Sequence, residues 1–318
     1  MSKPYIRVAA GVILNQNQQV LLAQRPEGKP WSGWWEFPGG KIEEDESVEQ
    51  ALARELKEEL GIEIAGAQKW VRFVYEYPKN IVELWFCKVT EWQGEPRGLE
   101  NQAFAWTEPA KAHTLGEVLP ASEDPLKWLQ LPEVYALSQW HSPEQQEAYK
   151  ARFEAALEQG VRLFQLREPN WPEGVGAKSL QAIFEYMLER CHAYGAQLIV
   201  NSVHPKAWAK KADGIQLRAQ DAVQLDERPL PKDKLVGVSC HHLADILYAQ
   251  QLEADFMVLG HVLETASHPD RPPIGWTQFS EFAQEAGRPV LAIGGQSMDS
   301  LKTAQAHGAH GVAILRAL

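Results

Sequence analysis

The sequence predicts an α/β protein in two parts: a mixed sheet sandwiched by helices over residues 1–131, then a TIM-type (β/α)8 barrel over residues 133–318. Two patterns support this prediction. In the first part, strand-like runs lie on both sides of one strong helix. In the second part, eight short apolar runs alternate with helical segments, as expected of parallel β-α units. With 318 residues, 45% of them hydrophobic, the chain can bury a sizeable core.

The strands of the first part are expected where Val, Ile and aromatic residues gather between turn residues, at 5–14, 19–25, 69–78 and 81–92. One helix interrupts them, from about Ser47 to Leu60. Ser47 and Gln50 have the spacing of a capping box, and Gly61 stands where a helix commonly stops in a left-handed conformation.

The eight runs of the second part are expected to form the barrel strands and lie at 134–138, 162–168, 197–202, 214–218, 234–240, 255–260, 288–295 and 311–318. Helical patterns separate them, for example at 143–159 and 179–195. The eighth run falls at the end of the sequence, without the usual final helix. We therefore expect that flank of the barrel to be covered by the first domain or by another subunit, so a homo-oligomer is possible.

Composition argues against several classes of partner. The formal net charge is −11, so a nucleic-acid polymer or an anionic membrane is not expected to bind. Cys87, Cys191 and Cys240 are far apart, which argues against a disulfide framework and a zinc cluster and favours a reducing cytoplasm. No run approaches the length of a spanning helix, and no export signal is expected.

The helix expected over 47–60 is unusually acidic. At a period of 3.6 residues, Glu55, Glu58 and Glu59 share one face, where like charges repel. Arg54 and Lys57 could relieve some of this repulsion on a solvated face, which is the ordinary interpretation of a charged helix. The other interpretation is a metal site, because Mg²⁺ prefers oxygen ligands and is commonly held by a few carboxylates together with substrate phosphates.

The surrounding residues favour the metal site. They fit the pattern G-x5-E-x7-R-E-U-x-E-E-x-G-U, in which U is aliphatic, with Gly40, Glu46, Arg54, Glu55, Leu56, Glu58, Glu59, Gly61 and Ile62. This pattern resembles the Nudix box. The resemblance implies that metal-activated water attacks a phosphorus atom of a nucleoside diphosphate linked to another group.

The Nudix resemblance also implies a role for each residue of the box. Glu55, Glu58 and Glu59, with the backbone carbonyl of Gly39, would bind Mg²⁺, with Mn²⁺ as an alternative. Arg54 would orient the catalytic carboxylates through a bidentate pair. The carboxylate at position 46 would support the junction between the loop and the helix.

Further segments of the first part, "WEFPGGKIE", "YEYP", "LWFCKVTEWQGEP" and "GLENQ", resemble the MutT-type 8-oxo-dGTP diphosphatases. In that resemblance Glu100 is an additional metal-site or base carboxylate, and Arg25 lies near the substrate phosphate. Phe37, Tyr77 and Leu84 would form the wall of the nucleotide pocket, although each could equally be plain core.

One position departs from the MutT pattern. Ser122, in "PASEDP", stands where that subfamily has an asparagine that reads the oxidised purine. A hydroxyl reaches fewer atoms of a base edge than an amide, although Asp124 could compensate. The leading hypothesis is hydrolysis of 8-oxo-dGTP to the monophosphate and pyrophosphate. The alternative is another pyrophosphate, for example one related to thiamine, with the barrel as a ligand-sensing or structural module.

The second part carries segments that resemble the thiamine phosphate synthase and TenI family of barrels: "FQLRE", "LIVNS", "GIQLRAQD", "GVSCHH", "GHVLETASHP", "AIGG" and "GAHGVAIL". Each segment falls at the C-terminal end of an expected strand, where barrel active sites are built. The candidate residues are Arg167, Asn201, Asp221, Ser239, His241, Thr265, Gly294 and Gly295. Amides of the two glycines, with the backbone near Gly311, could cradle a phosphate.

Three departures argue against synthase activity. Ser202 replaces an aspartate of the synthase pattern and leaves Asp221 as a lone Mg²⁺ carboxylate. Pro169/Asn170 and His268 stand where the pattern has lysines. A TenI-like thiazole tautomerase fits better, with His241 for proton transfer. The neighbouring His242 could face inward instead, and the barrel could also be a degenerate domain that binds a thiazole or thiamine phosphate or only supports the first domain.

Overall fold

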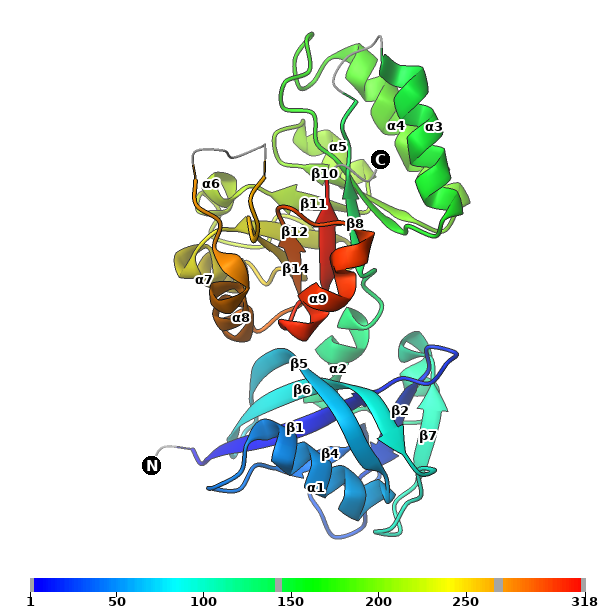
Figure 1. The fold of residues 1–318 in the computed structure, drawn as a ribbon, viewed down its shortest axis with the longest axis vertical. Helices are drawn as coiled ribbons and strands as arrows, with labels where there is room; N and C mark the ends of the chain where they lie inside the picture. Colours follow the sequence, from blue (N-terminus) through cyan, green and yellow to red (C-terminus); the bar gives the residue numbers. More distant parts are fainter. Residues whose placement is uncertain (1–2, 141–144, 266–270, 316–318) are drawn as a thin grey trace. The chain divides into compact units, whose positions relative to one another are not determined.

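The structure is a computed structural model that describes residues 3–140, 145–265 and 271–315 (Figure 1). The chain divides into two compact units, Met1–Leu131 and Pro132–Leu318. Each unit has its own sheet system and is described by itself. His268, for which a lysine was expected in a synthase, lies outside the described residues.

The first unit holds two sheets. The larger sheet has the strand order β4-β1-β6-β5, with β1 at Tyr5–Ile13, β4 at Gly39–Lys41, β5 at Glu63–Glu76 and β6 at Ile81–Gln93. Strand β1 runs parallel to β6 and antiparallel to β4, so this sheet is mixed, as expected. The smaller sheet has the order β3-β2-β7, with β2 at Val20–Gln24, β3 at Trp35–Glu36 and β7 at Phe104–Thr107.

Helices cover both faces of the larger sheet. Successive residues of β1 point to opposite faces. Ala9 and Ile13 pack with the apolar stripe of helix α1, Val48–Leu60. Val12 packs on the other face with Leu126 and Trp128 of helix α2, Pro120–Trp128. The expected α/β/α sandwich is therefore confirmed.

The ends of α1 follow the sequence signals. Ser47 and Gln50 form the reciprocal capping box, and Gly61 adopts a left-handed φ of 66°. Elements not foreseen in this unit are the short strands β3, β4 and β7, a 3-10 helix at Pro109–Thr114, and α2 itself. Two of these, β4 and α2, carry residues of the predicted site.

The second unit is a closed barrel of parallel strands in the order β8 to β15, as predicted. Its strands are β8 Val134–Leu137, β9 Leu163–Leu166, β10 Gln197–Asn201, β11 Gly214–Leu217, β12 Leu235–Cys240, β13 Phe256–Gly260, β14 Val290–Ile293 and β15 Gly311–Ile314. The described helices around it are α3 Gln146–Glu158, α4 Lys178–Ala193, α5 Lys206–Lys211, α6 Ala219–Ala222, α7 Leu243–Gln251, α8 Gly275–Glu285 and α9 Leu301–Ala306. None of the described helices of either unit is long and apolar enough to cross a membrane.

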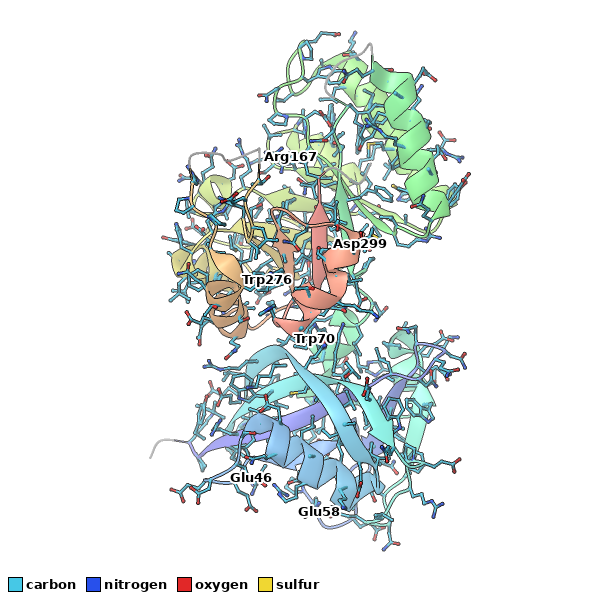
Figure 2. All side chains as sticks on the ribbon, in the orientation of Figure 1. Glu46, Glu58, Trp70, Arg167, Trp276 and Asp299 are labelled. Atoms are coloured by element: carbon cyan, nitrogen blue, oxygen red, sulfur yellow. The ribbon has the colours of Figure 1, made fainter. Side chains whose placement is uncertain are left out.

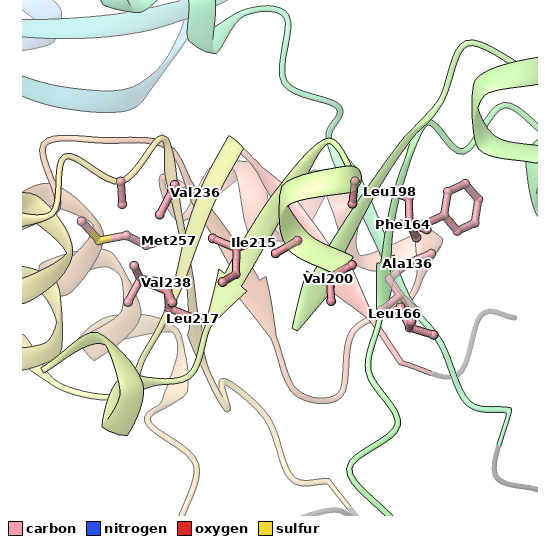
Figure 3. Packing of buried hydrophobic residues seen from close by; sticks show 14 of the residues in the cluster. Ala136, Phe164, Leu166, Leu198, Val200, Ile215, Leu217, Val236, Val238 and Met257 are labelled. Atoms are coloured by element: carbon pink, nitrogen blue, oxygen red, sulfur yellow. The ribbon is translucent and has the colours of Figure 1, made fainter. Parts of the chain in front are cut away.

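Alternation along the barrel strands separates an apolar outside from a partly polar inside. Outward residues such as Phe164, Val200 and Leu217 join the hydrophobic cluster between strands and helices (Figure 3). Their neighbours Gln165 and Gln216 are fully buried but lie outside that cluster, on the inner face. The strands thus place polar groups inside the barrel.

Candidate active site

Helix α1 carries a connected set of charges in the first unit. Arg54 donates to both carboxylate oxygens of Glu46, at 2.7 and 2.8 Å, and to Glu55 Oε1 at 2.9 Å. It also contacts Glu58 Oε2 at 3.3 Å and the Lys41 carbonyl oxygen at 3.0 Å. Figure 2 labels Glu46 and Glu58 near the two ends of the helix. Arg54 therefore ties the preceding loop to two acidic side chains of the helix.

The bidentate partner of Arg54 is Glu46 rather than a residue of the acidic face. The pKa of Glu46 falls to about 2 because Arg54 and the Glu43 N–H donate hydrogen bonds to it. A permanently charged Glu46 holds the guanidinium in one orientation. The single contact from Arg54 to Glu55 then fixes that carboxylate.

Glu59 is the most enclosed carboxylate of the helix. Its Oε2 accepts a hydrogen bond from the Gly39 N–H at 3.0 Å. Burial, together with the negative charges of Glu36, Glu55 and Glu100, raises its pKa to about 7 although the Gly39 hydrogen bond opposes the rise. Three other carboxylates, from α1, β3 and the segment before β7, thus lie near enough to Glu59 to act on its charge.

Two glycines allow β4 to approach this cluster. A Cβ on Gly40 would lie 2.2 Å from Glu55 Cδ, and a Cβ on Gly39 would lie 2.1 Å from the Ala9 carbonyl oxygen. Gly39 also has a φ of 139°, which side-chain-bearing residues rarely adopt. Backbone atoms of β4 can therefore reach the carboxylates directly.

The segment before β7 brings Glu100 to the same place. The Leu99 N–H and Gln102 Nε2 both donate to the Glu59 carbonyl oxygen, at 2.9 and 3.0 Å. These bonds anchor the segment to the C-terminal turn of α1. The Glu100 carboxylate itself lies 3.2 Å from Lys29 Nζ.

The barrel unit contains a cavity of about 830 Å³. Seven of the eight candidate residues of the barrel line it: Arg167, Asn201, Ser239, His241, Thr265, Gly294 and Gly295. Asp221 does not line it. Its carboxylate accepts hydrogen bonds from Arg218, at 2.6 and 2.9 Å, and from Ser202 Oγ.

The structure shows which of the neighbouring residues His241 and His242 faces the cavity. His241 lines the cavity, and its Nδ1 lies 2.7 Å from the Gly260 carbonyl oxygen. Because a carbonyl can only accept, Nδ1 carries the proton, and Nε2 of the neutral ring is left as an acceptor. His242 is exposed and contacts Asp245 at 3.2 Å.

Comparison with known proteins gives a family for each unit. Residues 4–151 match the model of the Nudix domain, and residues 134–318 match the model described as thiamine monophosphate synthase. The chain is a Nudix hydrolase joined to a thiamine monophosphate synthase family barrel. Both predicted resemblances are confirmed.

Three relatives illustrate these matches. The 8-oxo-dGTP diphosphatase of Haemophilus influenzae is 46% identical over 122 residues, which are 38% of this chain and 89% of that protein. The CTP pyrophosphohydrolase of Escherichia coli is 41% identical over 107 residues, which are 34% of this chain and 78% of that protein. The putative thiamine-phosphate synthase 2 of Aquifex aeolicus is 30% identical over 185 residues, which are 58% of this chain and 96% of that protein.

The donor set of the Nudix domain suits a hard divalent cation. Carboxylate and carbonyl oxygens are the ligands that Mg²⁺ takes. Among the described residues, Glu59 pairs with no lysine or arginine, whereas Glu36, Glu55 and Glu100 each do. Within the described residues, however, no three acidic, His or Cys side chains stand close enough to form a ready-made metal cluster. Instead, Glu55 and Glu58 contact Arg54, and Glu100 contacts Lys29. A cation would draw these side chains together.

Arg25, predicted near the substrate phosphate, is held by another partner in the Nudix domain. Its Nη1 donates to both oxygens of Glu36, at 2.7 and 2.8 Å. Glu36 was missed by the sequence analysis, although an acid between the buried Trp35 and Phe37 is itself a signal, since a buried charge needs a partner. Burial raises the pKa of Glu36, and Arg25 opposes that rise.

The predicted wall of the nucleotide pocket gathers on the α2 side of the sheet. Phe37 is buried edge-to-face against Phe86, with ring centroids 5.3 Å apart, and Leu84 packs on the same cluster. Tyr77 interacts with the Ala121 backbone, and burial raises its pKa to about 12. Ser122, the next residue, is buried, and its hydroxyl makes no hydrogen bond to any described residue.

Asp124, which could compensate for Ser122, is partly exposed on α2. Its carboxylate lies 3.9 Å from Lys127 Nζ. Its compensating role stays a prediction.

In the barrel, unlike at Glu59 of the Nudix domain, the carboxylate predicted to bind a metal already has a cationic partner. The lone carboxylate left by the Ser202 replacement, Asp221, is already neutralised by Arg218, which lines the cavity in its place. Asp221 is therefore not available as the Mg²⁺ carboxylate of the synthase pattern. Arg218 was also missed, although its position three residues before Asp221 predicts an ion pair on one helical turn.

The phosphate cradle expected at the glycines has suitable geometry. Gly294 and Gly295 have φ values of 95° and 68°, and a Cβ on either would collide with the segment at His261–Leu263. Within the described residues, the N–H groups of Gly295 and Gln296 donate no hydrogen bond. The Arg167 guanidinium likewise has no hydrogen-bonding partner there, and Arg167, labelled in Figure 2, lines the cavity.

Proposed function

We propose that the Nudix domain hydrolyses 8-oxo-dGTP to the monophosphate and pyrophosphate with a divalent cation, Mg²⁺ first and Mn²⁺ as a substitute. The observation that carries this proposal is that Glu36, Glu55 and Glu100 lie near enough to the partly buried Glu59 to raise its pKa. A buried excess of negative charge is unfavourable unless a cation offsets it. The 46% identical relative named 8-oxo-dGTP diphosphatase supports the choice of nucleotide.

The cation would be held by Glu55, Glu58, Glu59, Glu100 and the Gly39 carbonyl. When bound, it supplies a Lewis acid that neutralises phosphate charge and lowers the pKa of water. The remaining work belongs to the chain's own residues.

Glu59 keeps one carboxylate oxygen on the Gly39 N–H and has the other available to accept a proton from water. Arg54 orients Glu55, while Glu46 keeps Arg54 in place. Arg25, with Glu36 balancing its charge, stands at the end of β2 as a donor toward the phosphates.

The base would lie against the pocket wall of Phe37, Tyr77, Leu84 and Ser122. The Ser122 hydroxyl offers one donor and two acceptor lone pairs to a base edge. Steady-state kinetics with 8-oxo-dGTP, dGTP, CTP and thiamine diphosphate test this substrate choice. We expect kcat/KM to be highest for 8-oxo-dGTP; equal values for 8-oxo-dGTP and dGTP would refute the sanitising role.

The same kinetic comparison tests two other substrates, the nucleotide CTP and the cofactor thiamine diphosphate. Preference for CTP would follow the 41% identical CTP pyrophosphohydrolase instead. Preference for thiamine diphosphate would link the two domains in one pathway. The variant Ser122→Asn sharpens the result, because an amide in that position is expected to raise selectivity for the oxidised purine.

For the barrel, we propose binding of a thiazole or thiamine phosphate. The supporting observation is the cavity lined by Gly295, Gln296 and Arg167. The backbone N–H groups of the two former residues and the Arg167 guanidinium make no hydrogen bond to a described residue, although the Arg167 backbone N–H does. His241, with its Nε2 as an acceptor, is placed to move a proton in a tautomerase reaction. Calorimetry with thiazole phosphate tests binding, and loss of isomerisation in His241→Ala with retained binding tests the tautomerase. Absence of binding would leave a structural module.

A further inference from the structure

The loop between β2 and β3, residues 25–34, presents an aromatic side chain to solvent. Trp31 is 42% exposed, although tryptophan is usually well buried. Its backbone is left-handed, with a φ of 64°. Bulky residues rarely adopt this conformation, and strained backbone of this kind concentrates at functional sites.

Hydrogen bonds hold the loop in this shape. The Gly33 N–H donates to the Arg25 carbonyl oxygen at 2.9 Å, and the Trp34 N–H donates to the Trp31 carbonyl oxygen at 3.1 Å. Arg25 Nε donates to the Pro30 carbonyl oxygen at 2.9 Å. The orientation of Trp31 is therefore built into the fold.

Trp31 extends the proposed pocket wall toward solvent. Its ring centroid lies 4.7 Å from that of Trp34, in an edge-to-face arrangement, and 6.2 Å from that of Tyr77. Tyr77 in turn interacts with the Ala121 backbone beside Ser122. An aromatic surface thus continues from the predicted base-reading residue to the exposed ring.

The other side of the loop reaches the carboxylates. Lys29 Nζ lies 3.2 Å from Glu100 Oε2, and Glu100 is close enough to Glu59 to act on its charge. The loop therefore spans the distance between the catalytic carboxylates and the pocket wall. A nucleotide with its phosphates at Glu59 would lie along this loop with its base near Trp31.

We propose that Trp31 stacks on the base of the bound nucleotide and so strengthens its binding to the Nudix site. This inference rests on the proposed function, because it requires a nucleotide in the Nudix site. Every base has a flat π-face, so the contact adds affinity, whereas hydrogen bonds at the base edge select its identity. The strained backbone is the means by which the fold holds the ring over the base.

The test compares Trp31→Gly, Trp31→Phe and wild type as full-length proteins. Glycine removes the ring but suits the left-handed backbone, so the melting temperature is not expected to fall. We expect KM for the nucleotide to rise about tenfold or more in Trp31→Gly, with kcat within about twofold, given the strength of base stacking. Trp31→Phe keeps a π-face and is expected to retain most of the affinity.

Two controls separate stacking from general disturbance. Tyr5→Ala removes another exposed ring of the same unit, 55% exposed on β1, and is expected to leave KM unchanged. Inorganic triphosphate, a competitor without a base, should inhibit Trp31→Gly and wild type equally. Unchanged KM in a stably folded Trp31→Gly, or equal weakening toward inorganic triphosphate, overturns the inference.

The outcome is distinguishable from failure of the proposed function. If dGTP is hydrolysed as well as 8-oxo-dGTP, the proposed substrate preference fails, and the Trp31 comparison is made with dGTP. If no nucleotide is hydrolysed, calorimetric binding of dGMP to wild type and Trp31→Gly decides the matter. Equal affinities, or no binding to wild type, overturn the inference.

Discussion

The acidic residues of α1 and Asp221 of the barrel both occupy positions that their families use for metal-bound phosphates, but their surroundings differ. Around Glu59, carboxylates from several segments converge and raise its pKa. Around Asp221, Arg218 and Ser202 supply hydrogen bonds, and the pKa of Asp221 is lowered despite its partial burial. Glu59 pairs with no lysine or arginine in the described part of the chain, whereas Asp221 already pairs with Arg218. The proposed functions differ accordingly: a metal-dependent site in the Nudix domain, and a barrel site in which arginine and backbone amides would bind the anion.

The largest effect is expected from Glu59, the centre of the uncompensated charge. Glu59→Gln keeps the shape but can neither accept a proton nor bind a cation as a carboxylate. We expect kcat for nucleotide hydrolysis to fall about 10²- to 10⁴-fold. Glu44→Gln, an exposed acid just before the same helix, is the matched control and should hydrolyse nucleotide like wild type. A Glu59→Gln rate close to wild type would contradict the assignment of this helix as the metal site.

A smaller effect on activity is expected from Glu46, which contacts Arg54 and acts on Glu55 only through it. Glu46→Gln removes the charge that holds Arg54, so Glu55 loses its fixed orientation while every proposed ligand remains. We expect the Mg²⁺ concentration for half-maximal activity to rise about 10- to 100-fold, with activity recovering at high Mg²⁺. A titration of activity against Mg²⁺ measures this. A lower rate with no change in metal requirement would show that Glu46 acts on folding alone.

The barrel allows a test of a polar group, the Tyr135 hydroxyl, that supports the cavity-lining Gln165 without lining the cavity itself. The Tyr135 hydroxyl accepts from Gln165 Nε2 at 2.9 Å inside the barrel, and Gln165 accepts in turn from Asn201. Tyr135→Phe leaves the buried Gln165 donor without this partner and is expected to lower the free energy of unfolding by about 1–3 kcal/mol. Ligand affinity should change little, because Tyr135 does not line the cavity. Denaturant unfolding and calorimetry measure the two quantities, and a loss of affinity without a loss of stability would contradict this division.

Local signals made much of the fold predictable. Ser47 with Gln50 and Gly61 marked both ends of α1, and each of the eight apolar runs holds a barrel strand. The short strands β3, β4 and β7, two to four residues long, were missed because so few residues carry no periodicity and their pairing is set by distant segments.

For the candidate sites as well, local patterns could be predicted from the sequence and long-range pairings could not. Residue types at fixed spacing identified the acidic face of α1, but spacing cannot say which partner a charge will take. Arg25 pairs with Glu36, eleven positions away, because β2 and β3 are neighbours in a sheet that the sequence did not reveal. Arg218 was overlooked for a related reason, because residue types alone do not show which partner Asp221 takes. Its ion pair with Arg218 decides whether the Asp221 carboxylate is available to a metal.

The smallest effect is expected on the ligand affinity of the barrel when divalent cations are removed. Removing divalent cations with EDTA should abolish nucleotide hydrolysis, yet it should leave the affinity of the barrel for thiazole phosphate within about twofold, because Arg218 already neutralises Asp221. Calorimetry with and without EDTA measures this. Arg218→Ala is the informative variant: it exposes the Asp221 carboxylate, so phosphate binding should weaken and become dependent on Mg²⁺, which can bridge the carboxylate and the ligand. If EDTA weakens binding tenfold or more in the wild type, the barrel has kept a metal site, and the contrast between the two carboxylates is wrong.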